Sequence, residues 1–270
     1  MNKIKQNKIT FTLILSAITI TFSSLAILSL PVLFNYKSKL VKIENNFYKN
    51  FKLYLNSSGS ISYKPFPKPH LLVENASLSL HESDKSPLIK TTNLKVFISL
   101  RDLYLRSFRN FISTEISNTN LYIQLLDFKK IRKHFYESVN KPIFFKDCKF
   151  FIKNKKDKVI IISPVKKINY KINNKTKIKN FFVQGEVFGF NFKSDWKRNY
   201  DQPNKSLHLI NLINPSIEIK NLYEFKSAKE FKGFTEIEYS QDKLKYELNF
   251  NNNELKITSP LNKNINFNTE

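Results

Sequence analysis

The longest feature of the hydrophobic pattern is a run near the start of the chain, residues 9–36, that holds no charged side chain. Its segment ITFTLILSAITITFSSLAILSLPVLF has 26 residues. At ~1.5 Å per residue, a helix of that length exceeds the ~30 Å hydrocarbon core of a bilayer. The run is longer than the apolar region of a usual signal peptide, and only bulky residues stand where a cleavage site would need small ones. We therefore predict an uncleaved transmembrane anchor at residues 9–36.

The charges around this anchor bear on its orientation. Lysines stand on both sides of it, so the positive-inside rule alone does not orient it. The usual behaviour of a first helix places residues 1–8 in the cytoplasm. No second apolar stretch of spanning length follows, so residues 37–270 are expected in one aqueous compartment on the far side of the membrane.

Helical spacing of apolar residues occurs in two short segments after the anchor. Each segment repeats its apolar positions at intervals of three or four, which is typical of an amphipathic helix. These positions are Leu40, Ile43, Phe47 and Phe51 in the first segment and Phe128, Ile131, Phe135 and Val139 in the second. The first helix either caps a core or lies at the membrane surface, and the sequence leaves both roles open.

Most of the remaining chain alternates with a period of two, which predicts short antiparallel strands. The clearest case is KLKYELNF, in which Leu244, Tyr246, Leu248 and Phe250 share one face and polar residues share the other. The turns SQD and NNN bound this strand. We expect a meander with one wet face and one apolar face. No alternation of strands and helices is evident, so a parallel nucleotide-binding sheet is not expected.

Three prolines at alternate positions, Pro65, Pro67 and Pro69, interrupt the strand pattern. Proline lacks an N–H and fixes φ, so this segment cannot be an interior strand of a sheet. It is predicted to be an edge or an extended connector. Gly59 stands just before it, at a turn between two strand candidates.

The net charge of +23 suggests an anionic partner, either nucleic acid or a membrane surface. Lys, Asn, Ile and Phe are all abundant, however, as compositional bias alone would produce, and only five arginines occur. Proteins that read phosphates or bases rely on the forked geometry of Arg. A nucleic-acid partner is therefore not expected, whereas the charge suits a position near anionic lipid headgroups.

Motifs for chemistry are not found. The four histidines have no other His or Cys at zinc-ligand spacing, and no phosphate loop, dinucleotide fingerprint or nucleophile elbow occurs. The single cysteine, Cys148, excludes an intramolecular disulfide and is expected to be a small buried residue. We predict no enzyme, no cofactor and no metal site.

The elements in this order resemble the N-terminal part of the AsmA family, bacterial periplasmic proteins anchored in the inner membrane. The matching stretches are GSIS from Gly59, PFPKPHLLVENASLSL at residues 65–80 and LKVFISLRDLYL at residues 94–105. NTNLYIQ and FVQGEVFGFNFKSDW resemble later segments of the family. The resemblance extends over residues 5–260, with Gly59, Pro65, Pro67 and Pro69 as its motif residues, in a chain shorter than the larger members.

The resemblance implies both a fold and a function. The fold would be mainly β: an elongated, curved antiparallel sheet with an apolar inner face, plus the transmembrane helix and one or two short amphipathic helices. Residues 37–270 would be a periplasmic AsmA-like domain that shields or transfers phospholipid along this β-groove and supports outer-membrane assembly. Leu244, Tyr246, Leu248 and Phe250 are the candidate lipid contacts. Alternation is equally compatible with a closed β-sandwich that binds an envelope protein and no lipid.

Overall fold

The computed structural model describes residues 2–82, 87–227, 230–251, 254–259 and 264–268. It opens with helix α1 (Asn2–Ser29), which the 3-10 turn η1 (Leu30–Leu33) continues. Within the described residues, one helix is long and apolar enough to span a membrane, Phe11–Leu33, and it is exposed along its length. A helix that could form the predicted anchor is therefore present, and it ends at the turn that contains Pro31. Its orientation remains a prediction.

Three short helices follow α1, and two of them confirm the predicted amphipathic segments. They are α2 (Leu40–Phe51), α3 (Leu100–Tyr104) and α4 (Phe128–Ser138), with 3-10 turns η2 (Lys37–Lys39) and η3 (Leu125–Asp127). In α2 the side chains of Ile43, Phe47 and Phe51 are fully buried. The buried side of this helix therefore caps a core, which confirms one of its two predicted roles, while a position of its exposed side at the membrane surface remains a prediction.

The rest of the described chain is almost entirely strand. The strands are β1 (Tyr54–Ser57), β2 (Ile61–Lys64), β3 (His70–Ser79), β4 (Ile89–Ile98), β5 (Phe111–Ser117), β6 (Asn120–Gln124), β7 (Ile143–Lys153), β8 (Val159–Asn173), β9 (Ile178–Val187), β10 (Phe190–Asn199), β11 (Lys205–Leu212), β12 (Ile217–Ser227), β13 (Glu230–Tyr239), β14 (Asp242–Asn251), β15 (Glu254–Thr258) and β16 (Asn264–Asn268). The predicted NNN turn lies partly outside the described residues.

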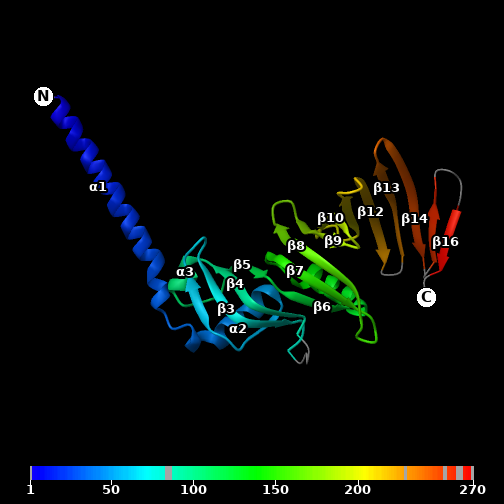
Figure 1. The fold of residues 1–270 in the computed structure, drawn as a ribbon, viewed down its shortest axis with the longest axis horizontal. Helices are drawn as coiled ribbons and strands as arrows, with labels where there is room; N and C mark the ends of the chain where they lie inside the picture. Colours follow the sequence, from blue (N-terminus) through cyan, green and yellow to red (C-terminus); the bar gives the residue numbers. More distant parts are fainter. Residues whose placement is uncertain (1, 83–86, 228–229, 252–253, 260–263, 269–270) are drawn as a thin grey trace.

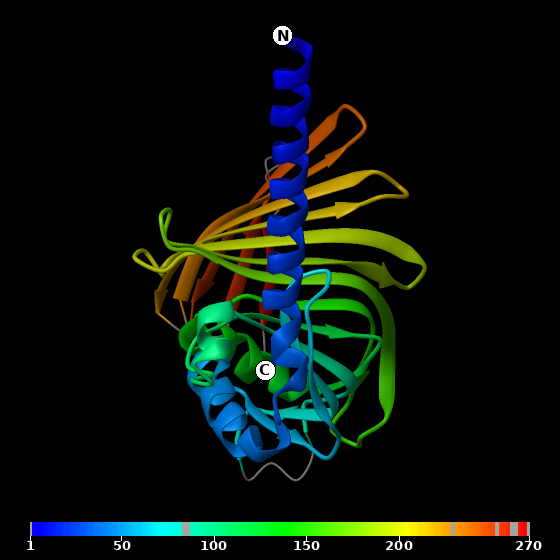
Figure 2. The ribbon, with the colours of Figure 1, turned by 90° about the vertical axis from the view of Figure 1, so that its left-hand side faces the viewer.

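All of these strands belong to one 16-stranded sheet. Its order is β1-β3-β4-β5-β7 and then consecutive from β7 to β16, with β2 beside β3 and β6 between β4 and β7. The sheet is elongated and curved, with α1 projecting from one end and β16 at the other (Figures 1 and 2). The prediction of a mainly β, elongated and curved sheet is confirmed.

The sheet departs from a pure antiparallel meander at β7. Strands β5 and β6 both pair with β7 in parallel. The cause is α4, which lies between β6 and β7 and returns the chain so that β7 runs in the same direction as β6. The expectation that no strand–helix–strand unit occurs was wrong for this segment: the helix was predicted, but its sequence does not show that the strands on either side of it pair in parallel.

The proline segment also differs from its prediction. Pro65, Pro67 and Pro69 form the loop between β2 and β3, which pair antiparallel with Lys64 opposite His70. The segment therefore reverses the chain instead of running as an extended connector. Gly59 lies on the other side of β2, and a Cβ there would collide with the backbone carbonyl of Glu74.

One face of the sheet carries the apolar side chains from end to end, and we call it the inner face. The pairing register places one row of residues directly opposite one another across eleven strands, β3 to β14. The row is Val73, Leu94, Ile116, Phe145, Ile168, Val183, Ser194, Ile210, Ile219, Ile237 and Leu244. Ser194 is its one polar member.

Helices cover the inner face over the first eight strands and close a core there. Phe51 of α2 stacks on Phe111 of β5, with ring centroids 6.4 Å apart. Phe135 of α4 meets Tyr170 of β8 edge to face at 5.9 Å. The Tyr170 hydroxyl lies 3.0 Å from the carbonyl oxygen of Phe135 and 2.9 Å from that of Val139, at the end of α4. These contacts place the core between the helices and strands β1 to β8.

Candidate functional site

Burial along the row that defines the inner face changes sharply after β8. Val73, Leu94 and Ile116 are fully buried, and Ile168 is nearly so. Beyond this point the same face is only half-buried, and Leu244 at the far end is 43% exposed. Within the described residues, no hydrophobic side chain after Tyr170 is fully buried. The sheet therefore continues its apolar face beyond the end of the closed core.

We call the inner face of β9 to β15 the open face. Its hydrophobic side chains come from alternate positions of seven strands, as the pairing register requires. They are Phe181, Val183, Val187, Phe190, Phe192, Trp196, Ile210, Leu212, Ile217, Ile219, Tyr223, Phe225, Phe231, Ile237, Tyr239, Leu244, Tyr246, Leu248, Phe250, Leu255 and Ile257. In the described part of the chain α4 is the last helix, and it reaches only the near edge of this face, where the Tyr136 ring lies 5.5 Å from that of Trp196.

Aromatic rings form the densest part of the open face. Phe225 and Phe231 lie with ring centroids 5.7 Å apart, and Phe231 stacks on Phe250 at 5.2 Å. Tyr223 meets Phe231 edge to face at 5.5 Å. Because three neighbouring strands contribute these rings, they make a continuous apolar surface across the sheet.

The structure brings the four predicted contact residues together on the open face. Leu244, Tyr246, Leu248 and Phe250 follow one another at alternate positions of β14, with Leu244 opposite Ile237 and Phe250 opposite Phe231. They belong to a face much larger than the one strand that the sequence singled out. Their contact with lipid remains a prediction.

The opposite face of the same strands is mostly charged. Glu236 of β13 pairs with Lys243 of β14 at 3.5 Å and with Lys220 of β12 at 3.7 Å. This side also carries an apolar group, in which Leu222 lies opposite both Leu207 and Phe234. The contrast between the two faces confirms the prediction of one wet and one apolar face for this part of the chain.

Four polar side chains cross the open face as a seam: Ser194, His208, Asn221 and Thr235. They form hydrogen bonds in two pairs. Ser194 and His208 are joined by a hydrogen bond of 2.8 Å, and the Thr235 hydroxyl donates to the side-chain oxygen of Asn221 at 2.7 Å. Burial lowers the pKa of His208, although the charge of Asp195 opposes the shift. The imidazole therefore favours its neutral form. A seam paired in this way does not need water to satisfy it.

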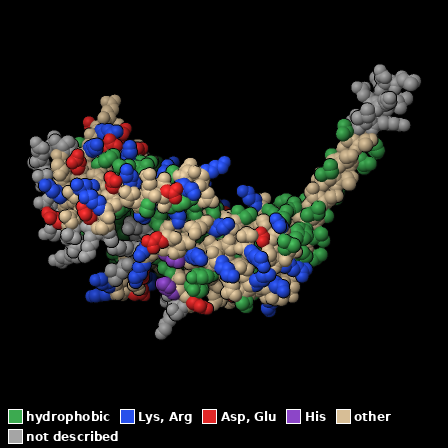
Figure 3. All heavy atoms as spheres, turned by 180° about the vertical axis from the view of Figure 1, so that it is seen from behind, with side chains coloured by type: hydrophobic (Ala, Val, Ile, Leu, Met, Phe, Trp, Pro, Cys, Tyr) green, Lys and Arg blue, Asp and Glu red, His purple; other side chains and the backbone are tan. Residues whose placement is uncertain are grey.

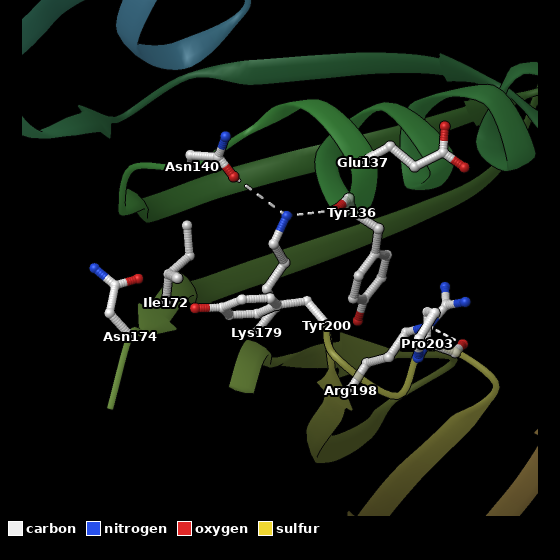
Figure 4. Close-up of a pocket in the computed structure, with 9 residues that line it drawn as sticks. All are labelled: Tyr136, Glu137, Asn140, Ile172, Asn174, Lys179, Arg198, Tyr200 and Pro203. Carbon is white, nitrogen blue, oxygen red and sulfur yellow. Dashed lines mark hydrogen bonds between the residues drawn. The ribbon is translucent and has the colours of Figure 1, made fainter. Parts of the chain in front are cut away.

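The closed core meets the open face at Lys179, which is 6% exposed (Figure 4). Its amine donates to the backbone carbonyl of Tyr136, to that of Val139 at 3.3 Å and to the Asn140 side chain at 3.5 Å. It thereby satisfies carbonyls left free at the end of α4. Burial, together with the nearby charge of Arg198, lowers the pKa of Lys179.

A pocket of about 600 Å³ opens beside this junction. Tyr136 and Arg198 line it side by side, with the guanidinium 5.7 Å from the ring centroid (Figure 4). The Arg198 Nε donates to the Pro203 carbonyl at 2.7 Å, which holds the side chain along the pocket wall. Sequence reasoning missed this junction, because Lys179 and Arg198 are ordinary charged residues of strands and only the β9–β10 register brings them together.

Comparison with known proteins gives no family assignment. No family model matches the chain, and no curated protein matches it significantly. The AsmA resemblance therefore remains a prediction. Within the described residues, no group of three or more His, Cys, Asp or Glu side chains could hold a metal ion. Chemically, the arrangement offers a broad apolar surface with a paired polar seam and charged edges.

Proposed function

We propose that this protein is a membrane-anchored, AsmA-like protein that shields phospholipid acyl chains on its open face and passes them along the sheet. The observation that supports the proposal is the single row from Val73 to Leu244, which is buried under helices at one end and uncovered at the other. An exposed apolar surface of this extent on a soluble domain marks an interaction site. Acyl chains are apolar, and so they suit an apolar surface of this kind.

The dimensions of the open face suit an acyl chain. Strands β9 to β15 are separated by six spacings of ~4.8 Å, so the face extends about 29 Å across the strands. The hydrocarbon of one leaflet is about 15 Å thick, half of the ~30 Å bilayer core. One acyl chain therefore fits with room to move from strand to strand, and each shielded CH₂ group contributes about 0.8 kcal/mol.

We also propose where the protein acts, and we propose no chemical reaction for it. Helix α1 would anchor the protein in the inner membrane with its N-terminus in the cytoplasm, and residues 37–270 would lie in the periplasm. There the protein would support outer-membrane assembly, with phospholipid as its partner. We propose no catalytic step and no cofactor, since shielding and transfer need only the apolar surface.

Photocrosslinking in intact cells tests the proposal on the full chain. A photoreactive aromatic amino acid replaces Phe250 on the open face or, as a matched control, Asn249, its neighbour on the opposite face. We expect phospholipid adducts by mass spectrometry at position 250 and none at position 249. Adducts to an envelope protein at position 250 would favour the alternative, a scaffold that binds a protein. The proposal is wrong if position 250 captures no lipid.

A further inference from the structure

A second surface, at the membrane end of the sheet, is strongly cationic. A shallow pocket of about 730 Å³ lies on the exposed side of α2, and no acidic residue lines it. Four cationic side chains and several neutral ones form its walls: Lys39, Lys42, Lys49, Arg109, Ser38, Val41, Asn45 and Asn46. None of the four cations takes part in an ion pair among the described residues. The charge of this pocket is therefore not neutralised within the described part of the chain.

The amphipathic pattern of α2 builds this pocket. Ile43 and Phe47 face the core, so residues at positions 41, 45 and 49 share the exposed side of the helix. The acidic residue of the same helix, Glu44, turns away from the pocket and accepts a hydrogen bond from the Ser57 amide at 3.3 Å. Glu44 and the lysines therefore lie on different sides of α2, and the only charged side chains of α2 that line the pocket are cationic.

Arginines extend this cationic surface along the next loop. Three of the five arginines in the chain, Arg101, Arg106 and Arg109, fall within nine residues, and all three are exposed. The Lys42 amine donates to the Arg106 carbonyl at 2.9 Å, and the Asn50 side chain donates to the Arg109 carbonyl at 2.8 Å. These bonds hold the loop against α2, so pocket and arginines form one surface.

Asp102 is the acid within that loop. Its carboxylate accepts hydrogen bonds from the hydroxyls of Ser99, at 2.8 Å, and Ser107. Burial on its own would raise the pKa of Asp102, but these hydrogen bonds outweigh it and lower the pKa. The carboxylate is engaged by these hydroxyls, and the charge of Arg101 also helps to lower its pKa, while none of the three arginines forms an ion pair among the described residues.

Contacts with α1 fix this surface at the level of the membrane. The Tyr104 hydroxyl donates to the carbonyl oxygen of Ile27 in α1. Ile27 lies six residues before the end of the apolar span at Leu33, roughly 9 Å along a helix. The headgroup layer of a bilayer is only about 5–8 Å thick on each side. If α1 spans a bilayer with Leu33 at the outer edge of the headgroup layer, the loop after Tyr104 lies where headgroups meet acyl chains.

The exposed apolar residues of this surface agree with that depth. Leu105 is 67% exposed and Val41 is 68% exposed, each next to cationic residues. Arg106 places its guanidinium 4.5 Å from the ring centroid of Phe34, just beyond the apolar span. Figure 3 shows hydrophobic side chains along α1 and at its junction with the body of the protein, with Lys and Arg beside them.

We propose that this surface binds the phosphate groups of anionic phospholipids in the leaflet where α1 ends. Arginine suits phosphate because its planar fork donates two parallel hydrogen bonds, while Leu105 and Val41 reach the acyl boundary. The site is separate from the open face and requires only that α1 crosses a membrane. Each cation near an anionic bilayer contributes roughly fivefold to the affinity. Removing three should therefore weaken the preference for anionic lipid roughly a hundredfold.

Hydrogen exchange of the full chain in nanodiscs tests this proposal. Discs of phosphatidylcholine with and without phosphatidylglycerol are compared. The variant R101Q/R106Q/R109Q is set against K243Q/K245Q/K256Q, which removes the same charge from the outer side of β14 and β15. We expect phosphatidylglycerol to protect residues 38–49 and 100–109 in the wild type and the lysine variant, and not in the arginine variant. Circular dichroism confirms that both variants are folded.

Several further results would overturn the proposal. Equal protection in both lipid mixtures would mean that the surface does not recognise anionic lipid, and equal loss of protection in both variants would mean that only the total charge of the protein matters. Soluble glycerol phosphate is added to discs that lack phosphatidylglycerol, and full protection by it would assign the site to free phosphates instead of headgroups. A Leu105→Trp variant checks depth independently: lipids with a quencher near the headgroup should dim its fluorescence well beyond that of Trp196 alone, and no added quenching would contradict the placement.

Discussion

The open face should lose lipid when its aliphatic row is made polar. Ile219 and Ile237 lie directly opposite each other on β12 and β13, in the middle of the row that ends at Leu244. Both are half-buried, so each still has apolar surface to cover with a ligand. The double variant I219S/I237S replaces this pair with small polar side chains without adding charge.

The size of the effect follows from the area left exposed. Full burial of an Ile side chain is worth about 1.5–3 kcal/mol, and roughly half of that remains for a ligand to gain at each half-buried position. Two positions therefore contribute about 1.5–3 kcal/mol to lipid binding. With 1.4 kcal/mol for each factor of ten, affinity should fall between about tenfold and about a hundredfold.

The matched control is the pair Leu222 and Phe234, which lie opposite each other on the same two strands but on the outer face. Phospholipid retained per chain is measured by native mass spectrometry, and affinity by displacement of a fluorescent fatty acid. L222S/F234S should bind as the wild type does, while I219S/I237S should not. Equal binding by all three proteins would refute an acyl-binding role for this face, and equal loss in both variants would point to general destabilisation.

Three further outcomes concern stability. Phe51→Ala empties a fully buried position in α2 and should cost about 3–5 kcal/mol in chemical denaturation. Burial would raise the pKa of Glu115, but hydrogen bonds from Lys146 and Lys95 lower it. The ionised Glu115 therefore stabilises the fold above its unfolded pKa near 4.3, and this stabilisation is lost as pH falls through the folded pKa. Glu115→Gln should lower the free energy of unfolding by about 1.5–3 kcal/mol at pH 7. The stability of this variant should also depend less on pH in the acid range. The lowered pKa of His208 should likewise reduce stability as pH falls below about 6.5, and melting curves of His208→Asn should lack that step.

The two amphipathic helices were predictable because the burial of Ile43, Phe47 and Phe51 imposes helical spacing on the sequence itself. The face that contains Leu244 was predictable for a related reason, since lysines occupy the alternate positions of β14. Strand β11 is harder to interpret, because Leu207 and Leu209 place apolar side chains on its outer face as well. There the alternation that marks a face disappears from the sequence.

Features that depend on distant segments could not be found in the sequence. The parallel pairing of β7 depends on where α4 places the chain. The cationic pocket joins Lys42 of α2 to Arg109, which is far along the chain. Proline chemistry excluded Pro67 from the sheet interior, but it did not say whether the segment would extend or turn. In each case the local sequence restricts the possible conformations, and contacts between distant segments determine which one forms.

The choice between a closed core and an open face illustrates the same limit. Apolar alternation is as strong at Ile116 as at Ile237, so the strands alone predict one continuous face. The two parts of the sheet differ in whether helices place side chains over the apolar face. Helices α2 and α4 bring Phe47 and Phe135 over the first strands, whereas residues 139–268, where described, form no helix. The row keeps its apolar character for six strands beyond the helices that cover it, and this is why we expect an apolar ligand or partner to cover it there.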